Sequence, residues 1–526
     1  MIDPNTLSSK HKKSQFFLLL LILGAGAFFR FYGIDAQLPY LQHPDEPIYV
    51  EISRTIFQTG DLNPHFFKYP SLFFYLRTLA YIPFYYTGKI AGAFDSPGDI
   101  MGIINLTMGV SKAQTPSLII FDRSITVFFG VLSIFFVFLI GTKMLRNRYF
   151  ALLPALFLAL FRSNLYLDKV IAPDTFLLFF LLLTAYYTLC LFETPSRKNY
   201  ILAGLSAGLA ISVKYNGGLI LLPILIAHLI LEKKKALKNI NIYIAIAATG
   251  LGFILTSPFA LLDFNTFIHD FYFEMMHYSK VGHIGMQGNT LQWYASYLYK
   301  YVGIIILSLA LLQIIKGLWN FTPRLIIFAS FPVVYFIMVA RILVRNERTI
   351  FLIVPFIFIL AVGFISDLIS SKNSRLQTSA GWIGLLLLIL PLYHHTNAAV
   401  YVSKNYYYSP NHDLAREWIN ANIPENSKIV LESYSPFISP EKYNITGLKR
   451  IINQDIDWYL EENVDYIIVS DMMYSRFFKN PEQYKREHDQ YQHIFNKFQH
   501  LKTFDKQGRP VQIFKVTEKT LHLNNF

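Results

Sequence analysis

The sequence contains little charge and almost no cysteine. Its 526 residues include a single cysteine, Cys190, which excludes an internal disulfide framework and any multi-cysteine metal site. Charged residues make up 15% of the chain, against about 25% in an average soluble domain. The mean hydropathy is +0.36, which is too high for an ordinary water-soluble enzyme. These shortages exclude a row of three or four soluble domains, which the length alone would suggest.

Long apolar runs take the place of the missing charge. Apolar residues are 53% of the chain and aromatic residues 16%, and the aromatic residues suit a bilayer and its interfaces. A helix needs about 20 apolar residues to cross the hydrocarbon core. We therefore predict a polytopic α-helical membrane protein with about eleven spans, near 16–34, 123–142, 149–166, 170–192, 199–214, 216–231, 240–262, 299–318, 325–341, 348–369 and 378–395.

The positive charge indicates how the chain lies in the membrane. The net charge is +13, and all of it lies in the first 395 residues, because 396–526 is neutral. A nucleic-acid-binding protein would carry a basic stripe on a soluble fold, so we predict the lipid bilayer and no nucleic acid as a partner. The positive-inside rule places the N-terminus and the basic connectors in the cytoplasm. This holds only if 70–93 does not cross, so we interpret 70–93 as an interfacial or re-entrant helix. A twelfth span is the alternative.

The last quarter of the chain differs from the rest. Residues 413–422 predict an amphipathic helix, and 428–431 and 466–469 predict buried strands. We therefore predict two domains, a transmembrane catalytic domain at 1–395 with interfacial helices in its outer loop 35–122, and a small α/β domain at 396–526. Eleven spans starting from a cytoplasmic N-terminus place that α/β domain outside the cytoplasm.

Polar residues gather at the predicted outer ends of the spans. The adjacent carboxylates Asp45 and Glu46 follow the first span, and favourable placement in the first turn of a helix is one explanation for them. An ion pathway would spread polar groups to mid-depth, whereas crowding at one face is typical of an outward-opening active site. The histidines lack metal-ligand spacing, and a divalent ion at Asp45 or Glu46 stays open. The other candidate site residues are Lys68, Arg123, Asp174, Lys214, His283, Arg345 and Arg348.

The order of these motifs resembles the GT-C superfold of lipid-linked sugar transferases. The likeness is greatest to the branch of protein O-mannosyltransferases and lipid A aminoarabinose transferases, and it covers roughly residues 15–400. Tyr69 departs from the proline that the family often has there, so the pocket rim is expected to differ. The matching pieces are Asp45-Glu46, F-K-Y-P-S-L at 67–72, Asp122-Arg123-Ser124, A-P-D-T-F-L-L-F-F at 172–180, K-Y-N-G at 214–217, G-H-I-G at 282–285 and R-N-E-R at 345–348.

The resemblance implies a membrane glycosyltransferase. Its donor would be a polyprenyl- or dolichyl-phosphate sugar, and its acceptor an extracytoplasmic protein, lipid or glycan. Asp45 matches the family's base, which activates the acceptor, and Glu46 would assist by positioning or by holding a metal. The cations Lys68, Arg345 and Arg348, with Arg123 as a fourth, would stabilise the leaving lipid phosphate, and displacement by one base would invert the anomeric centre. The alternative is a polytopic lipid or solute transporter or flippase, which would show broken spans and inverted repeats.

Overall fold

The chain forms two compact units. The structure is a computed structural model and describes residues 9–41, 43–282, 284–286, 288–371, 375–405, 410–506 and 508–518. The helical unit comprises Met1–Ile34, Thr55–Thr87 and Phe121–Asn405, and the sheet unit comprises Asp35–Arg54, Gly88–Ile120 and Tyr406–Phe526. The predicted outer loop 35–122 is therefore divided between the two units.

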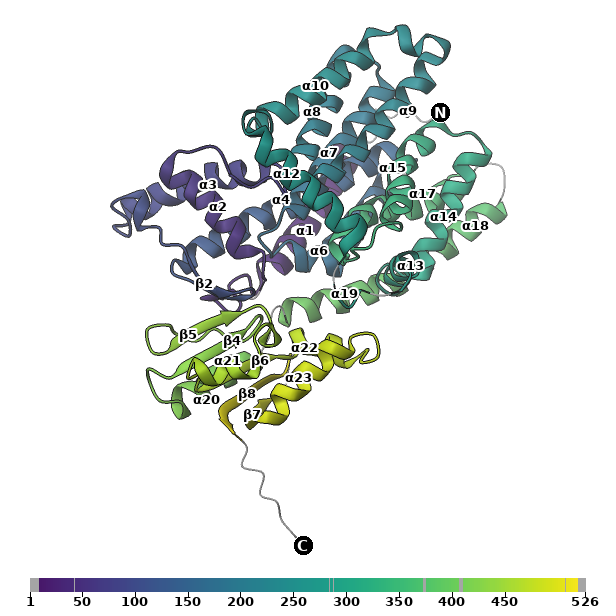
Figure 1. The fold of residues 1–526 in the computed structure, drawn as a ribbon. Helices are drawn as coiled ribbons and strands as arrows, with labels where there is room; N and C mark the ends of the chain where they lie inside the picture. The colour runs from purple at the N-terminus through teal and green to yellow at the C-terminus, as the bar shows by residue number, and fades with distance from the viewer. Residues whose placement is uncertain are drawn as a thin grey trace. The chain divides into compact units, whose positions relative to one another are not determined.

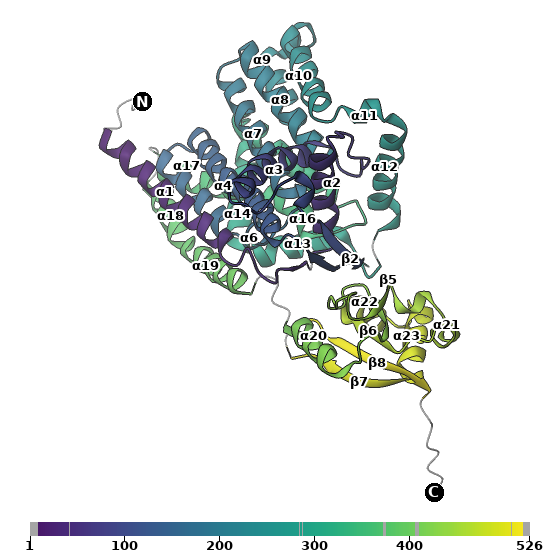
Figure 2. The same cartoon turned by 90° about the vertical axis from the view of Figure 1, so that its left-hand side faces the viewer.

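Helices of many lengths build the helical unit (Figures 1 and 2). Two helices belong to the predicted outer loop. They are α2 (Glu46–Thr59), which begins in the sheet unit, and α3 (Leu72–Ile90). The others are α1 (Ser9–Phe31), α4 (Pro116–Met144), α5 (Leu152–Leu160), α6 (Arg162–Leu167), α7 (Pro173–Glu193), α8 (Arg197–Val213), α9 (Leu221–Glu232), α10 (Ile240–Thr256), α11 (Phe259–Leu262), α12 (Phe264–Met276), α13 (Thr290–Tyr301), α14 (Ile304–Trp319), α15 (Pro323–Val339), α16 (Glu347–Ile350), α17 (Val354–Ile369), α18 (Arg375–Leu387) and α19 (Ile389–Lys404).

Several of these helices can cross a membrane. Among the described residues, six are long and apolar enough, and the pair α13 and α14, bent by 113°, is a seventh candidate. The other predicted spans correspond to the shorter helices α5, α8, α10 and α15. The prediction of a multi-pass helical membrane protein is thus confirmed, while the number eleven stays a prediction. Helix α3 does not meet the same criterion, and whether 70–93 crosses stays a prediction too.

Small residues let two of the helices pack closely. A Cβ added to Gly204 on α8 would lie 2.3 Å from the carbonyl oxygen of Ala245 on α10, and one added to Gly208 would lie 2.3 Å from that of Thr249. Close backbone approach at glycine is a common way for helices to associate in lipid, where no hydrophobic force drives them together. The two helices run side by side in Figure 1.

A five-stranded sheet organises the sheet unit, in the order β5-β4-β6-β8-β7. Strand β4 (Lys428–Glu432) pairs in parallel with β5 (Asn444–Leu448) and β6 (Tyr466–Ser470). Strands β8 (Val511–Glu518) and β7 (Phe498–Phe504) continue the sheet antiparallel. The accompanying helices are α20 (Pro410–Asn422), α21 (Ile456–Glu461), α22 (Asp471–Phe478) and α23 (Lys485–Lys497). The predicted helix 413–422 and both predicted strands are confirmed, and so is a C-terminal domain built on a sheet.

Strand alternation gives the sheet two buried faces. Ile429 and Leu431 enter one hydrophobic core, while Val430 enters the other, because successive side chains of a strand point to opposite faces. The first core also takes in Val110 from the first outer loop. That loop forms a second, three-stranded sheet from β1 (Tyr40–Leu41), β3 (Val110–Ala113) and β2 (Ile103–Thr107). Residues far apart in the sequence thus share the sheet unit.

Candidate functional site

Three helix ends in the helical unit bring one carboxylate and two cations together. Asp174 is the second residue of α7, Lys214 directly follows α8, and Arg348 lies on α16. Lys214 Nζ lies 2.9 Å from Asp174 Oδ1, and Arg348 Nε lies 4.0 Å from Asp174 Oδ2. The helix dipole stabilises an acidic group at the start of a helix, such as Asp174, and a cation at its end, such as Lys214. The dipoles explain the pair of Asp174 and Lys214. Arg348 is a second cation, and it gives the cluster of three a net positive charge.

The cluster is partly accessible. The side chains of Lys214 and Arg348 are 12% and 21% exposed, whereas that of Asp174 is 2% exposed. A partly desolvated, net positive site strengthens the attraction of an anion, because fewer water molecules screen the charges. The ring of Tyr69 faces the Lys214 ammonium at 5.3 Å from its centroid. The site can therefore bind a phosphate group with an aromatic ring beside it.

A hydrogen-bonded chain holds the cluster in place. Asn216 Nδ2 donates to the Tyr335 hydroxyl at 2.9 Å, and that hydroxyl donates to the carbonyl of Thr349 at 3.2 Å. Thr349 neighbours Arg348 on α16, and Asn346 caps this helix by accepting from the Thr349 backbone N–H at 2.9 Å. The short helix that carries Arg348 is thereby tied to the segment after Lys214.

Two buried polar atoms, one in the cluster and one in the hydrogen-bonded chain beside it, have no hydrogen-bond partner among the described residues. They are Asp174 Oδ2 and Asn216 Oδ1. Leaving a buried acceptor unsatisfied costs about 1–3 kcal/mol, so such atoms call for an explanation. A ligand that offers hydroxyl donors, such as a sugar, would satisfy both atoms.

Lys68 and Arg345 lie on separate segments of the helical unit. The Lys68 ammonium is 4.5 Å from the ring centroid of Phe273 on α12. Its segment is held because the Phe67 backbone N–H donates to Asp270 Oδ2 at 2.9 Å. Burial, and next the positive charge of Lys68, lower the pKa of His277 below its usual value. The guanidinium of Arg345, which is 8% exposed, donates to the carbonyl of Gly288 at 3.0 Å.

Arg123 differs from the other predicted cations. It is 1% exposed on α4, and its Nη1 donates to the Ile34 carbonyl at 2.8 Å. Its neighbour Asp122 makes a buried ion pair with Arg77. These contacts give Arg123 a place in the packing of the helical unit, and its role towards substrate stays a prediction. His283 lies outside the described residues.

The predicted base lies in the sheet unit, in a short turn. Asp45 is half-buried directly before α2, and Glu46, which is fully buried, is the first residue of that helix. The Asp45 backbone N–H donates to His43 Nδ1 at 3.3 Å. The expected helix start near these carboxylates is confirmed. Within the described residues, no group of three or more His, Cys, Asp or Glu side chains could hold a metal ion.

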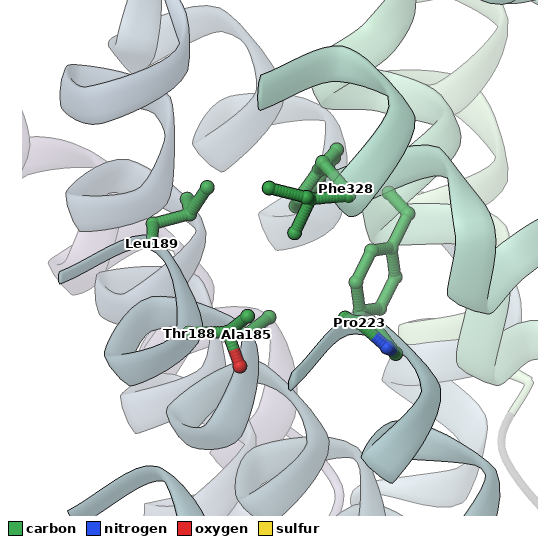
Figure 3. A pocket seen from close by; sticks show the side chains of 7 residues that line it. Ala185, Thr188, Leu189, Pro223 and Phe328 are labelled. Carbon is green, nitrogen blue, oxygen red and sulfur yellow. The ribbon is translucent and has the colours of Figure 1, made fainter. Parts of the chain in front are cut away.

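The lining of an apolar pocket in the helical unit includes none of these charged residues (Figure 3). Its volume, about 10 Å³, is near the minimum for one water molecule, so it does not hold a sugar. It is lined by Ala185, Thr188, Leu189, Pro223, Ile327, Phe328 and Phe356.

Some residues around the cluster were not predicted from the sequence. Tyr69 and Asn216 lie inside the quoted motifs, next to the predicted Lys68 and Lys214. Tyr335 lies in an apolar run, where an isolated tyrosine is an ordinary core residue. Its hydrogen bonds to Asn216 and to the Thr349 carbonyl connect it to the cluster.

Comparisons with known proteins give information on the fold and on the enzyme class. Residues 113–261 match the family model described as dolichyl-phosphate-mannose-protein mannosyltransferase. The archaeal oligosaccharyltransferase AglB from Archaeoglobus fulgidus, solved with an inhibitory peptide and a dolichol-phosphate, is similar in structure. It has a TM-score of 0.58 and 11% identity over 98% of this chain and 76% of AglB.

A second similar structure comes from a protein of nearly the same length as this chain. ArnT from Cupriavidus metallidurans, bound to undecaprenyl phosphate, has a TM-score of 0.52 and 12% identity, over 94% of this chain and 97% of ArnT. No curated protein matches the sequence. At these identities the structural likeness establishes the fold, and the family-model match adds the enzyme class. The chain is therefore a multi-pass membrane protein with the GT-C fold and a glycosyltransferase, as the sequence predicts.

Proposed function

We propose that this protein transfers a sugar from a polyprenyl- or dolichyl-phosphate donor to an extracytoplasmic acceptor. The observation that carries the proposal is the cluster of Asp174, Lys214 and Arg348, with its net positive charge and its unsatisfied buried acceptors. The cations suit the phosphate, and the acceptor atoms suit sugar hydroxyls. The acceptor is a protein, a lipid or a glycan.

The predicted residues have separate roles in the proposed sugar transfer. Asp45 removes the proton from the acceptor nucleophile, which attacks the anomeric carbon while the bond to the lipid phosphate breaks. Glu46 positions Asp45. Lys68, Lys214, Arg345 and Arg348 stabilise the negative charge that develops on the departing phosphate. Attack from the face opposite the phosphate inverts the anomeric centre.

The proposed topology places eleven spans in the membrane, with the N-terminus in the cytoplasm and the sheet unit outside. Ser96, Glu461 and Lys234 are exposed, so each can be replaced by cysteine after Cys190 is removed. An impermeant reagent on intact cells should label cysteines at 96 and 461 and leave the one at 234 unlabelled. Labelling at 234 with protection at 96 would contradict this topology.

The activity is tested with purified protein and a synthetic polyprenyl-phosphate sugar. We expect release of free polyprenyl phosphate when membranes from the host supply the acceptor. Asp45→Asn protein serves as the control for contaminating enzymes. Movement of intact lipid between leaflets, with no cleavage, would instead support a flippase.

A further inference from the structure

The short turn that carries Asp45 is attached at both ends to one β-hairpin. This docking hairpin consists of β2 and β3, residues 103–113. Before the turn, β1 pairs with β3 at Tyr40↔Lys112 and Leu41↔Ser111. After the turn, the Glu51 side chain on α2 accepts from the Ile103 backbone N–H at 2.7 Å. A shift of the hairpin is therefore passed to Asp45 from both sides.

The docking hairpin is itself seated on the C-terminal sheet. The Tyr434 backbone N–H donates to the Met108 carbonyl at 2.9 Å, and the hydroxyl oxygens of Thr107 and Ser433 lie 3.1 Å apart. A Cβ added to Gly447 on β5 would lie 2.1 Å from the Leu106 carbonyl oxygen. Backbone thus packs directly on backbone, which leaves little room for the hairpin to shift.

A second contact holds the strand before the turn. The guanidinium of Arg416 on α20 stacks on the Tyr40 ring, 3.6 Å from its centroid. Arg416 is fixed in turn, because its Nε donates to the Phe437 carbonyl at 2.9 Å and its Nη1 donates to Asp413 at 2.7 Å. The Phe437 ring also contacts Tyr40, with 5.7 Å between ring centroids. Tyr40 lies only five residues before Asp45.

We propose that the C-terminal sheet domain positions the catalytic base, with Arg416 and Gly447 as positioning residues that act through Tyr40 and the docking hairpin. The inference rests on the proposed role of Asp45 as the base. A base must be held within about 0.5 Å of its productive position, and a displacement of about 1 Å costs about 100-fold in rate. A two-residue strand cannot supply that rigidity alone, whereas the hairpin seated on the C-terminal sheet can.

The test compares Arg416→Ala with Arg416→Lys and Gly447→Ala in the full-length protein. We expect kcat to fall about 10- to 100-fold in Arg416→Ala and Gly447→Ala, with the KM for the donor unchanged, because the phosphate cations lie on other segments. Arg416→Lys keeps a cation over Tyr40 and should recover part of the loss. Lys442→Ala is the matched control, because Lys442 makes an exposed ion pair with Glu425 on the same domain.

A reversible rescue separates positioning from general stability. Cysteines at Thr107 and Ser433, in the Arg416→Ala protein without Cys190, can form a disulfide that fastens the docking hairpin. We expect oxidation to restore most of kcat and reduction to remove it again. Mass analysis of trapped thiols verifies that the bond has formed. A formed disulfide that leaves kcat low would overturn the proposal.

The outcomes distinguish this inference from the proposed function. If Asp45→Asn retains normal turnover, the assignment of the base is wrong and the positioning role falls with it. If Asp45→Asn is inactive while folded Arg416→Ala and Gly447→Ala both keep the kcat of the unmodified protein, only the positioning role is wrong.

Discussion

Two sets of charges in the helical unit show the same residue types used in different ways. Arg30 Nε lies 2.6 Å from Asp168 Oδ2, and both side chains are 0% exposed. Arg77 and Asp122 form a second pair that is equally enclosed. The cluster of Asp174, Lys214 and Arg348 also consists of a carboxylate with cations, yet its two cations remain partly accessible.

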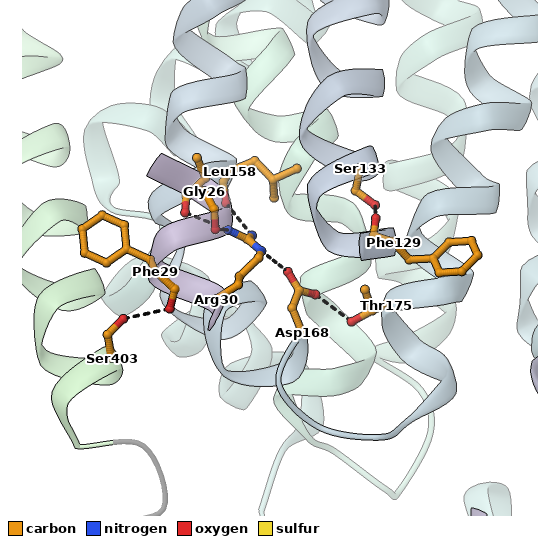
Figure 4. Close-up of polar contacts among 10 residues, drawn as sticks. Gly26, Phe29, Arg30, Phe129, Ser133, Leu158, Asp168, Thr175 and Ser403 are labelled. Atoms are coloured by element: carbon orange, nitrogen blue, oxygen red, sulfur yellow. Dashed lines mark hydrogen bonds and ion pairs between the residues drawn. The ribbon is translucent and has the colours of Figure 1, made fainter. Parts of the chain in front are cut away.

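The partners of the enclosed pair explain the difference (Figure 4). Arg30 also donates to the carbonyls of Gly26 and Ala159, each at 3.0 Å, while Asp168 accepts from the Thr175 hydroxyl at 2.7 Å. Buried charges persist when protein partners satisfy them, and such a pair has no capacity left for a ligand. The accessible cluster instead retains unsatisfied acceptors. The Arg77–Asp122 pair is less complete, because Arg77 Nη1 is buried without a hydrogen-bond partner among the described residues. The partial exposure of its two cations therefore distinguishes the cluster from both enclosed pairs.

The largest effect is expected at Asp45, the accessible carboxylate proposed as the base. Asp45→Asn should lower kcat by about 10²–10⁴-fold, because the acceptor loses its proton acceptor. Donor binding and the yield of folded protein should stay near normal. The measurement is turnover of a polyprenyl-phosphate sugar under single-turnover conditions. Near-normal turnover would reject the assignment and make Glu46 the next candidate.

Substitutions at the enclosed pair of Arg30 and Asp168 should lower the stability of the protein and leave catalysis by the folded protein unchanged. Arg30→Ala leaves Asp168 buried without its cation, which costs about 3–5 kcal/mol. Gly130→Ala should act in the same direction, because its Cβ would lie 2.5 Å from Asp168 Oδ2. Thermal unfolding in detergent measures both effects. Gly24→Ala is the matched control, since nothing lies within 4 Å of its added Cβ, and an equal loss there would contradict the comparison.

Removing a cation from the accessible cluster should reduce catalysis more than stability, the reverse of what we expect for the enclosed pair. Lys214→Ala should lower donor turnover by about 10²–10³-fold, because a fixed charge on the leaving phosphate is lost, with a smaller effect on folding. Lys316→Ala is the control, because Lys316 pairs with Asp367 at 2.6 Å in a similar lysine–aspartate pair. If both variants kept normal turnover, the phosphate role of Lys214 would be wrong.

The smallest expected effect is a pH dependence of stability caused by a buried carboxyl group in the sheet unit. This group is Glu432, which is fully buried. Burial raises the pKa of Glu432 to about 8, although the Tyr491 hydroxyl and backbone N–H groups oppose the shift. The folded state therefore keeps a proton that the unfolded chain releases, and this contribution to stability is lost as the pH rises towards about 8. Stability should fall by on the order of 1 kcal/mol per pH unit.

The measurement needs a control for the other buried groups that titrate near neutral pH. Burial lowers the pKa of His412 to about 4, so His412 weakens the fold in acid and would mask the effect of Glu432. Unfolding temperatures are therefore compared between about pH 7 and about pH 8. Glu432→Gln should flatten the dependence, and the exposed Glu461→Gln should not. An equal pH dependence of the wild-type and Glu432→Gln proteins in this window would exclude the raised pKa of Glu432.

Hydrophobic patterns and motifs in the sequence predicted the class of fold and much of the local structure. Hydrophobic runs fit helices because a bilayer leaves no other way to satisfy the backbone, and short β-rich runs such as Tyr466–Val469 fit buried strands. The motif order predicted the GT-C fold. These features are local or periodic, so a single chain displays them directly.

The pairing of charges and the division of residues between the two units could not be predicted from the sequence. Asp122 meets Arg77, which is 45 residues away, and Asp174 meets Lys214, which is 40 residues away. Asp168 lies only six residues before Asp174, yet it is enclosed in an ion pair with Arg30. Val110 likewise enters the core of the C-terminal sheet. Such contacts depend on how helices and strands pack in three dimensions, and no periodicity along the chain encodes that packing.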